Sequence, residues 1–207
     1  MTDKGAIQQI LGSLMKNPSF LSEVDKYSLS ISDFSTKLER LVFTAISNLW
    51  KKGAQKISPF DIENYWESND AAKKIFEQTN GLEYLQDIEE FAAVENFFYY
   101  YNKLKKLNLL KDLKKQGFDI SGFYMDDLTD PRALEINQRF EELTIGDIVE
   151  RIKKKLLTLE SNYSGTGEVQ EWNIADDIDE LVENFGKDGS IGLPIQGAIF
   201  SKIIDGA

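Results

Sequence analysis

The stretch TKLERLVFTAISNLWKKG (residues 36–53) decides the fold class of this chain. Its apolar residues recur three or four positions apart, a spacing that places them in one stripe along one face of an α-helix. They are Leu38, Leu41, Val42, Ala45, Ile46, Leu49 and Trp50. Two lysines and Gly53 end the pattern, as is common at helix C-termini. The stretch therefore predicts an amphipathic helix with one face in a core.

Helix signals of the same kind continue along the chain. Ser58 and Pro59 are typical of a helix N-cap and first helical position. DAAKKIFEQ predicts a short helix that ends at Asn80-Gly81. The segment GLEYLQDIEEFA predicts another, because Leu82, Leu85 and Ile88 fall at helical spacing.

Five consecutive aromatic residues, at positions 97–101, stand near the start of the next predicted helix. Aromatic residues favour strands, but leucines follow this run at every third position among lysines. We therefore expect one long helix over residues 95–116, closed by Gly117. Asp130-Pro131 marks a further helix start by the same cap-then-proline pattern. Two long helices separated by a loop predict an α-helical hairpin.

A separate linker helix is predicted after Thr144. Thr144 and Asp147 resemble a capping box with aspartate in place of glutamate, and they open the segment IGDIVERIKKKLLTLE. Its apolar residues alternate four and three positions apart and form a two-heptad seam, which is too short for a stable coiled coil alone. We therefore expect the seam to dock on another surface. It consists of Ile145, Ile148, Val149, Ile152, Leu156 and Leu159.

These signals predict an all-α protein with four parts. We expect a small helical bundle over residues 1–91, a helical hairpin over 92–143, the linker helix over 144–161, and a flexible acidic tail over 162–207. Residues 161–207 carry two lysines against nine acidic side chains, and NYSGTGEVQEWN has the composition of a linker.

The amino-acid composition excludes several classes of binding and catalytic function. The 207 residues include 24 Lys plus Arg and 35 Asp plus Glu, a net charge of −11. This negative net charge argues against nonspecific binding of nucleic acid or of an anionic membrane, although a local basic face is still possible. The chain has no cysteine and no histidine, which excludes thiol nucleophiles, Cys/His zinc sites and Ser-His-Asp triads.

No segment of the sequence is typical of membrane insertion or secretion. Nowhere do about 18 apolar residues run together, and the first residues, MTDKGAIQQILG, lack the basic and apolar regions of a signal peptide. We expect a soluble cytoplasmic protein with no membrane partner.

The order of these features resembles the N-terminal domain of DnaB-type replicative DNA helicases. The matching features are the turn Leu11-Gly12-Ser13, the pair Asp33-Phe34 before the long amphipathic helix, Gly53, and the helix start at Pro59. NGLEYLQDI resembles the family's Gly-Leu-x-Tyr-Leu element, which precedes its hairpin. GLPIQGAIFSKIIDGA resembles the start of the family's RecA-like motor domain. The resemblance covers nearly the whole chain.

Two segments depart from the family pattern. Residues 95–101 are more aromatic than the family's, and residues 161–185 form a longer and more acidic linker. The divergent linker suggests a phage or prophage origin.

The resemblance implies a subunit of a hexameric, ATP-driven helicase of the primosome. In that family the N-terminal domains form a collar that self-associates, from dimers to hexamers, and receives primase or a helicase loader. The linker helix packs on a neighbouring motor. ATP, magnesium and single-stranded DNA bind to the motor, which the resemblance places beyond these residues.

A phosphate-binding loop is absent from the sequence. Its pattern G-x-x-x-x-G-K-[ST] surrounds phosphates with backbone N–H groups. The only Gly-Lys pair is Gly186-Lys187, where Leu181 replaces the first glycine and Asp188 follows. We therefore expect the chain itself to bind no cofactor and hydrolyse no ATP.

Two sets of residues are the predicted interaction sites, and no catalytic set is found. The subunit-contact set on the long helix is Phe97, Phe98, Tyr100, Tyr101, Leu104 and Leu107. The seam of the linker helix, listed above, is the predicted docking site for the motor. The adjacent pairs Glu89-Glu90 and Glu141-Glu142 diverge on a helix and form no acid/base couple.

Several alternatives stay open at this point. The aromatic residues can pack in the hairpin's own core or stack on single-stranded DNA beside the lysines. Those lysines are Lys103, Lys105, Lys106, Lys111, Lys114 and Lys115, for which a solvated face is the commoner explanation, as it is for Lys153-Lys154-Lys155. The tail carboxylates are better explained as a solvated segment than as a magnesium site; they are Asp176, Asp177, Asp179, Glu180 and Glu183. The rival to the collar function is a stand-alone adaptor or inhibitor that joins a helicase collar.

Overall fold

The computed structural model describes residues 2–163, and within them every regular element is a helix. The prediction of an all-α fold is confirmed. The α-helices are α1 (Lys4–Lys16), α2 (Lys37–Lys51), α3 (Pro59–Trp66), α4 (Asp70–Gln78), α5 (Gly81–Phe91), α6 (Phe97–Lys115), α7 (Ala133–Glu142) and α8 (Ile145–Tyr163). Short 3₁₀ turns are η1 (Pro18–Ser22), η2 (Ile31–Asp33) and η3 (Val94–Asn96). The predicted acidic tail lies outside the described residues apart from positions 162 and 163.

Side-chain caps set most helix starts where the sequence predicts them. In α2, the Thr36 hydroxyl accepts from the Glu39 N–H, and the Glu39 carboxylate accepts from the Thr36 N–H at 2.9 Å. Ser58 caps α3 with Asp61 in the same reciprocal way. At α8, the Thr144 N–H donates to Asp147 at 2.7 Å, so the predicted aspartate variant of the capping box forms.

The start of α7 differs from the prediction. Asp130 accepts from the Arg132 backbone N–H at 2.8 Å and also binds its guanidinium, which makes a tight turn over residues 130–132. The helix therefore begins at Ala133, two residues after the predicted Pro131, and spans ten residues. The second helix of the hairpin is thus shorter than the long helix that the sequence predicts.

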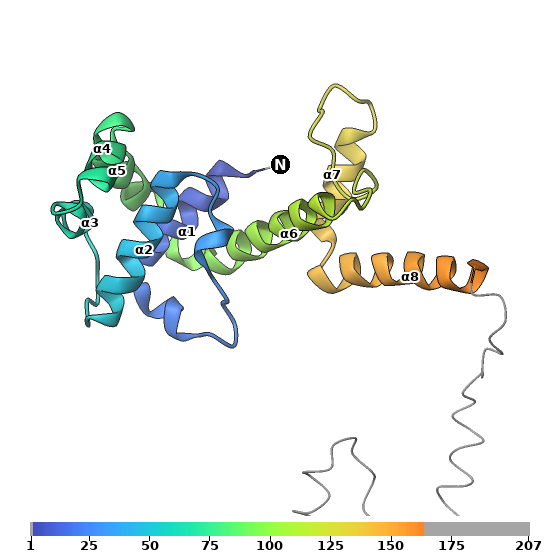
Figure 1. Cartoon of the computed structure of the whole chain (residues 1–207), viewed down its shortest axis with the longest axis horizontal. Coiled ribbons are helices and arrows are strands. Elements are labelled where there is room, and N and C mark those ends of the chain that lie inside the picture. Colours follow the sequence, from blue (N-terminus) through green and yellow to red (C-terminus); the bar gives the residue numbers. More distant parts are fainter. Residues whose placement is uncertain (1, 164–207) are drawn as a thin grey trace, which may run out of the picture. The chain divides into compact units, whose positions relative to one another are not determined.

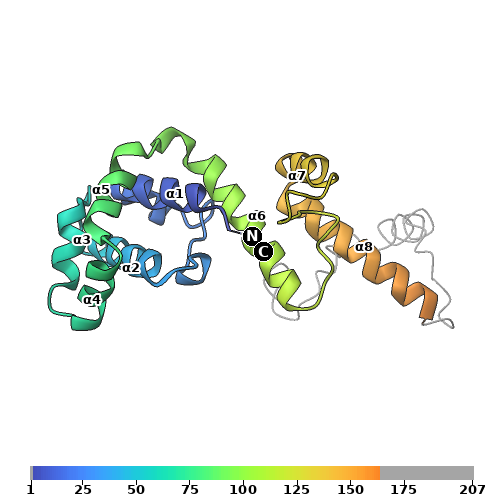
Figure 2. The same ribbon diagram turned by 90° about the horizontal axis from the view of Figure 1, so that it is seen from above.

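The described residues up to Lys154 form one compact unit, with two hydrophobic clusters. The first is built by α1 to α5 and the N-terminal half of α6, and α1 packs directly against α2, α5 and α6 (Figures 1 and 2). The second joins the C-terminal half of α6 to residues 118–124, α7 and the start of α8. Leu104 belongs to the first cluster and Leu107 to the second, so α6 is shared by both.

Gly12 allows the close approach of α1 to α5. A Cβ atom at this position would lie 2.0 Å from the Ile88 carbonyl oxygen and 2.7 Å from the Ala92 Cβ. Because backbone atoms cannot yield as a flexible side chain can, only glycine fits at this crossing. The prediction of a turn at Leu11-Gly12-Ser13 is wrong, because these residues lie within α1. Gly12 is needed for the close packing of two helices and not for a turn.

Candidate interaction surfaces

The aromatic run at the start of α6 is divided between the core and the surface. Phe97 is 2% exposed; its ring stacks on Phe20 at 4.1 Å and meets Tyr27 edge-on at 5.0 Å. Tyr101 is also buried, and its hydroxyl accepts from the Ser28 backbone N–H at 2.9 Å. These two residues hold the loop after η1 against α6.

Four of the six predicted subunit-contact residues are covered within the chain. They are Phe97, Tyr101, Leu104 and Leu107. Their burial is what the alternative of core packing predicts. Phe98 is 60% exposed and Tyr100 is half-buried, so only these two of the predicted set reach the surface.

The surface of this turn also includes Tyr99, which the sequence prediction omits. Tyr99 is 53% exposed, and its ring meets the ring of Tyr100 edge-on at 5.0 Å. We call Phe98, Tyr99 and Tyr100 the aromatic edge of α6. The sequence contains the signal for Tyr99, because it is two residues from Phe97 and Tyr101 and so faces away from both.

Three lysines in the first half of α6 bind other segments of the chain, whereas Lys114 and Lys115 are exposed, as the solvated-face explanation predicts. The Lys106 ammonium donates to the carbonyl oxygens of Phe140 and Glu141 at 2.9 and 3.0 Å and lies 4.8 Å from the Phe140 ring centroid. It thus caps the C-terminus of α7. Burial lowers the pKa of Lys106. Lys106 is 6% exposed, so the solvated-face interpretation is wrong here.

Two neighbouring lysines bind other segments. Lys103 lies 3.0 Å from Asp3 and 3.2 Å from Glu141, and thereby joins the start of α1 to α7. Burial disfavours its charge, but hydrogen bonds to both carboxylates raise the pKa of Lys103 above its usual range. Lys105 donates to the buried Asp33 at 2.9 Å and to the Ser28 carbonyl oxygen at 2.9 Å. Because the ammonium groups of Lys103, Lys105 and Lys106 bind groups within the chain, the first half of α6 is poorly suited to bind a phosphate backbone.

The seam of α8 is half covered and half exposed. Ile148 and Ile152 are buried in the second cluster, beside Leu107, Leu110 and Phe140. The first half of the seam therefore has a partner within the chain, which the sequence did not reveal. Val149 is half-buried and Ile145 is 39% exposed.

The C-terminal half of the same seam is open. Leu156 and Leu159 are 48% and 53% exposed, and Tyr163 is 86% exposed. Tyr163 follows Leu159 by four residues and so extends the seam by one turn. Lys153, Lys154 and Lys155 are exposed, as the sequence predicts.

In the described part of the chain, no three acidic side chains are grouped closely enough to hold a metal ion. The tail carboxylates, for which a magnesium site is the less favoured explanation, lie outside the described part. Glu141, one of the paired carboxylates, binds Lys103, and Glu89 lies 3.4 Å from Lys56. Among residues 2–163, no helix is both long and apolar enough to cross a membrane.

Comparison with known proteins identifies the family. The family model for the DnaB-like helicase N-terminal domain matches residues 3–106, which include α1 to α5 and the first half of α6. The chain belongs to the DnaB-like helicase N-terminal domain family. The predicted resemblance is thereby confirmed. The match contains the whole first cluster and the aromatic edge.

A relative of this DnaB-like chain comes from a prophage. The chain is 34% identical, over 208 aligned positions, to the SPbeta prophage-derived uncharacterized protein YorI of Bacillus subtilis (strain 168). The alignment covers 100% of this chain and 41% of the relative, so the chain spans about two fifths of that protein's length. The prophage source of the relative agrees with the predicted phage or prophage type.

Proposed function

We propose that this chain is the collar part of a hexameric DnaB-like replicative helicase. In this role it joins subunits to one another and docks primase or a helicase loader in the cytoplasm. The observation that carries the proposal is the family match over residues 3–106. ATP hydrolysis, magnesium binding and contact with single-stranded DNA would belong to a motor domain, and none of these steps is assigned to the residues described.

The aromatic edge supports the part of the proposal that concerns self-association. Phe98 and Tyr99 expose more than half of their surface next to a rigid helix turn that Phe97 anchors in the core. Large aromatic residues on a preorganised surface are typical anchors of protein interfaces, because they bury much area at little entropic cost. Tyr100 adds a hydroxyl beside this apolar surface.

The open half of the α8 seam supports docking on a motor domain. Leu156, Leu159 and Tyr163 present apolar side chains one turn apart, each about half exposed or more. Each aliphatic side chain that becomes buried contributes about 1.5–3 kcal/mol when it leaves water. The same helix is held at its other end by Ile148 and Ile152. We therefore assign this half-seam to a neighbouring motor.

Solution mass tests the proposal. Light scattering across a concentration series should show the chain as a dimer or larger, and the double variant Phe98→Asp/Tyr99→Asp should shift the mass toward the monomer with an unchanged helix content. Phe60→Asp is the matched control, because Phe60 is 56% exposed on α3. A parent chain that stays monomeric at the highest concentration would contradict the collar function.

A further inference from the structure

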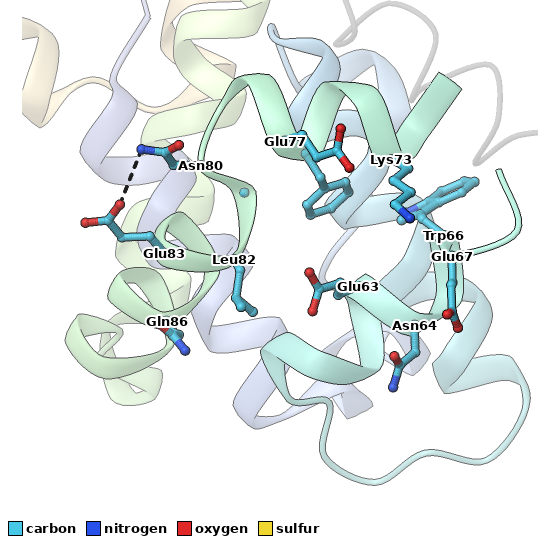
Figure 3. Close-up of a pocket in the computed structure, with 12 residues that line it drawn as sticks. Glu63, Asn64, Trp66, Glu67, Lys73, Glu77, Asn80, Leu82, Glu83 and Gln86 are labelled. Carbon is cyan, nitrogen blue, oxygen red and sulfur yellow. Dashed lines mark hydrogen bonds between the residues drawn. The ribbon is translucent and has the colours of Figure 1, made fainter. Parts of the chain in front are cut away.

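A pocket of about 670 Å³ lies among α3, α4 and α5 (Figure 3). Trp66, Phe76 and Leu82 supply its large apolar side chains, one from each helix. Four glutamates also line it: Glu63, Glu67, Glu77 and Glu83. We call this site the α3–α5 pocket.

The apolar part of the α3–α5 pocket is held in place by the fold. The Trp66 indole N–H donates to the Leu41 carbonyl oxygen at 3.2 Å, which fixes the ring at the end of α3. Phe76 packs on Gly81 so closely that a Cβ atom there would lie 2.2 Å from the Phe76 ring. A preformed apolar surface lowers the entropic cost of binding a side chain.

The negative charge of the described residues is concentrated around this pocket. Residues 58–91, which contain α3 to α5, include nine acidic and two basic side chains. The other residues between positions 2 and 163 include 17 acidic and 20 basic side chains. The four pocket glutamates are exposed and have no ion-pair partner in the described part of the chain, and Lys73 is the one basic residue of the lining. Such a region attracts positively charged partners.

The two kinds of lining residue together indicate what the pocket binds. An apolar side chain gains free energy when it leaves water to cover Trp66 and Phe76. Arginine or lysine beside it can pair with the glutamates. A small cation would use only the carboxylates, and an uncharged segment would use only the apolar residues. The lining therefore favours a peptide segment in which basic residues flank one large apolar residue.

A second copy of this chain is a poor match for that description. The lysines in the first half of α6 already bind groups within the chain. The lysines of α8 share their helix with Glu150 and Glu160, so that helix is close to charge balance. Lys56, before α3, lies 3.4 Å from Glu89. The excess negative charge of residues 58–91 is therefore better matched by a different protein.

We propose that the α3–α5 pocket docks a basic segment of a partner protein, with one large apolar residue of that segment seated on Trp66 and Phe76. The flanking basic residues pair with the glutamates of the lining. This inference deepens the docking part of the proposed function and rests on it. It gives the partner a stated chemistry, and it places the partner on α3 to α5, which leaves the aromatic edge and the open half of the α8 seam free.

Fluorescence quenching with a synthetic peptide tests the contact. Trp50→Phe/Trp172→Phe leaves Trp66 as the only tryptophan of the chain, and circular dichroism checks that its helix content is unchanged. The probe is a peptide with one leucine flanked on each side by two arginines. It should bind saturably and protect Trp66 from quenching by acrylamide. The control peptide has glycine in place of the leucine and should give little protection.

Charge removal provides the second arm of the test. Glu63→Gln/Glu67→Gln should weaken binding of the leucine peptide about tenfold, as expected for the loss of two partly exposed ion pairs. The matched control is Asp87→Asn/Glu90→Gln, which removes the same charge from exposed positions on α5 that do not line the pocket. This control should change the affinity by less than about twofold.

Three results would overturn the inference. The first is no protection of Trp66 by the leucine peptide. The second is equal protection by both peptides, or equal weakening by both pairs of substitutions, because it indicates nonspecific attraction to negative charge. The third is a shift of Glu63→Gln/Glu67→Gln toward the monomer, which would assign the pocket to a second copy. A parent chain that is monomeric but binds the leucine peptide would contradict the collar function alone.

Discussion

Helices α6 and α8 are both rich in apolar residues, yet they distribute them differently. In α6 the apolar residues lie on more than one face and contribute to both hydrophobic clusters, and only Phe98 and Tyr99 are more than half exposed. In α8 one seam runs along one face, buried at Ile148 and Ile152 and open at Leu156 and Leu159. The difference shows that apolar spacing indicates which residues share a face, whereas burial depends on which partner the fold brings to that face.

The two halves of the α8 seam should differ most in their effect on stability. Ile148→Ala removes a fully buried side chain from the second cluster and should lower the free energy of unfolding by about 2–5 kcal/mol. Leu159→Ala, the matched change in the open half, should alter it by less than about 0.5 kcal/mol in the monomer. Urea denaturation of both variants measures the difference. Equal losses of unfolding free energy would contradict the distinction between a buried and an open half of the seam.

The buried lysine of α6 should be the next most sensitive position. Lys106→Met keeps the apolar stem but leaves the Phe140 and Glu141 carbonyl oxygens without their donor, at a cost of about 1–3 kcal/mol. Lys114→Met, on the exposed side of the same helix, should be nearly neutral. Thermal unfolding compares the two variants. A solvated lysine face would instead predict the same small effect for both.

Removal of the hydroxyl group should affect stability at Tyr101 but not at Tyr99, two residues away in the aromatic run. Tyr101→Phe leaves the Ser28 N–H without its acceptor and should cost about 0.5–1.5 kcal/mol. Tyr99→Phe removes a hydroxyl from a side chain that is 53% exposed, and we expect no measurable change. Hydrogen exchange at the Ser28 amide is the direct readout. Faster exchange in Tyr101→Phe alone supports the division of the run into core and surface.

The ion pair between Asp3 and Lys103 should give a small, pH-dependent effect. Burial works against the Asp3 charge, but hydrogen bonds from the Ala6 N–H and Lys103 lower the pKa of Asp3 below its ordinary value of 3.8. Stability from a lowered carboxylate pKa is present above the unfolded-state pKa and is lost as the pH falls through the folded-state value. Asp3→Asn keeps an N-cap acceptor but removes the charge. The variant should therefore be less stable than the parent at neutral pH and equally stable in strong acid, where Asp3 of the parent is protonated.

Much of the fold could be predicted because local signals and tertiary packing agree. Reciprocal caps at Thr36, Ser58 and Thr144 set three helix starts, and positive φ at Gly53 and Gly117 accompanies two predicted ends. The start of α7 could not be placed, because the Asp130 side chain stabilises a turn that competes with the first helical turn. Local sequence does not reveal which of the two conformations is lower in free energy.

The candidate surfaces were predicted less well, for a related reason. The roles of Lys103 and Lys106 depend on Asp3 and on the end of α7, which are distant in sequence. Ile148 is buried by residues of α6 and α7. These helices are separate from α8 in the sequence, so the periodicity of α8 alone does not show that they pack on it. The family resemblance supplied the functional prediction, and the structure shows which of the predicted contact residues are exposed and therefore available for the proposed interactions.

One matched pair tests the central claim, that adjacent residues of α6 serve the chain's own core and a second chain. Phe97→Asp and Phe98→Asp make the same chemical change one residue apart, at 2% and 60% exposure. Thermal unfolding and solution mass, measured on both variants, should show that Phe97→Asp loses the cooperative transition while Phe98→Asp keeps it and shifts toward the monomer. Equal loss of folding in both variants, or an unchanged mass for Phe98→Asp, would contradict the account.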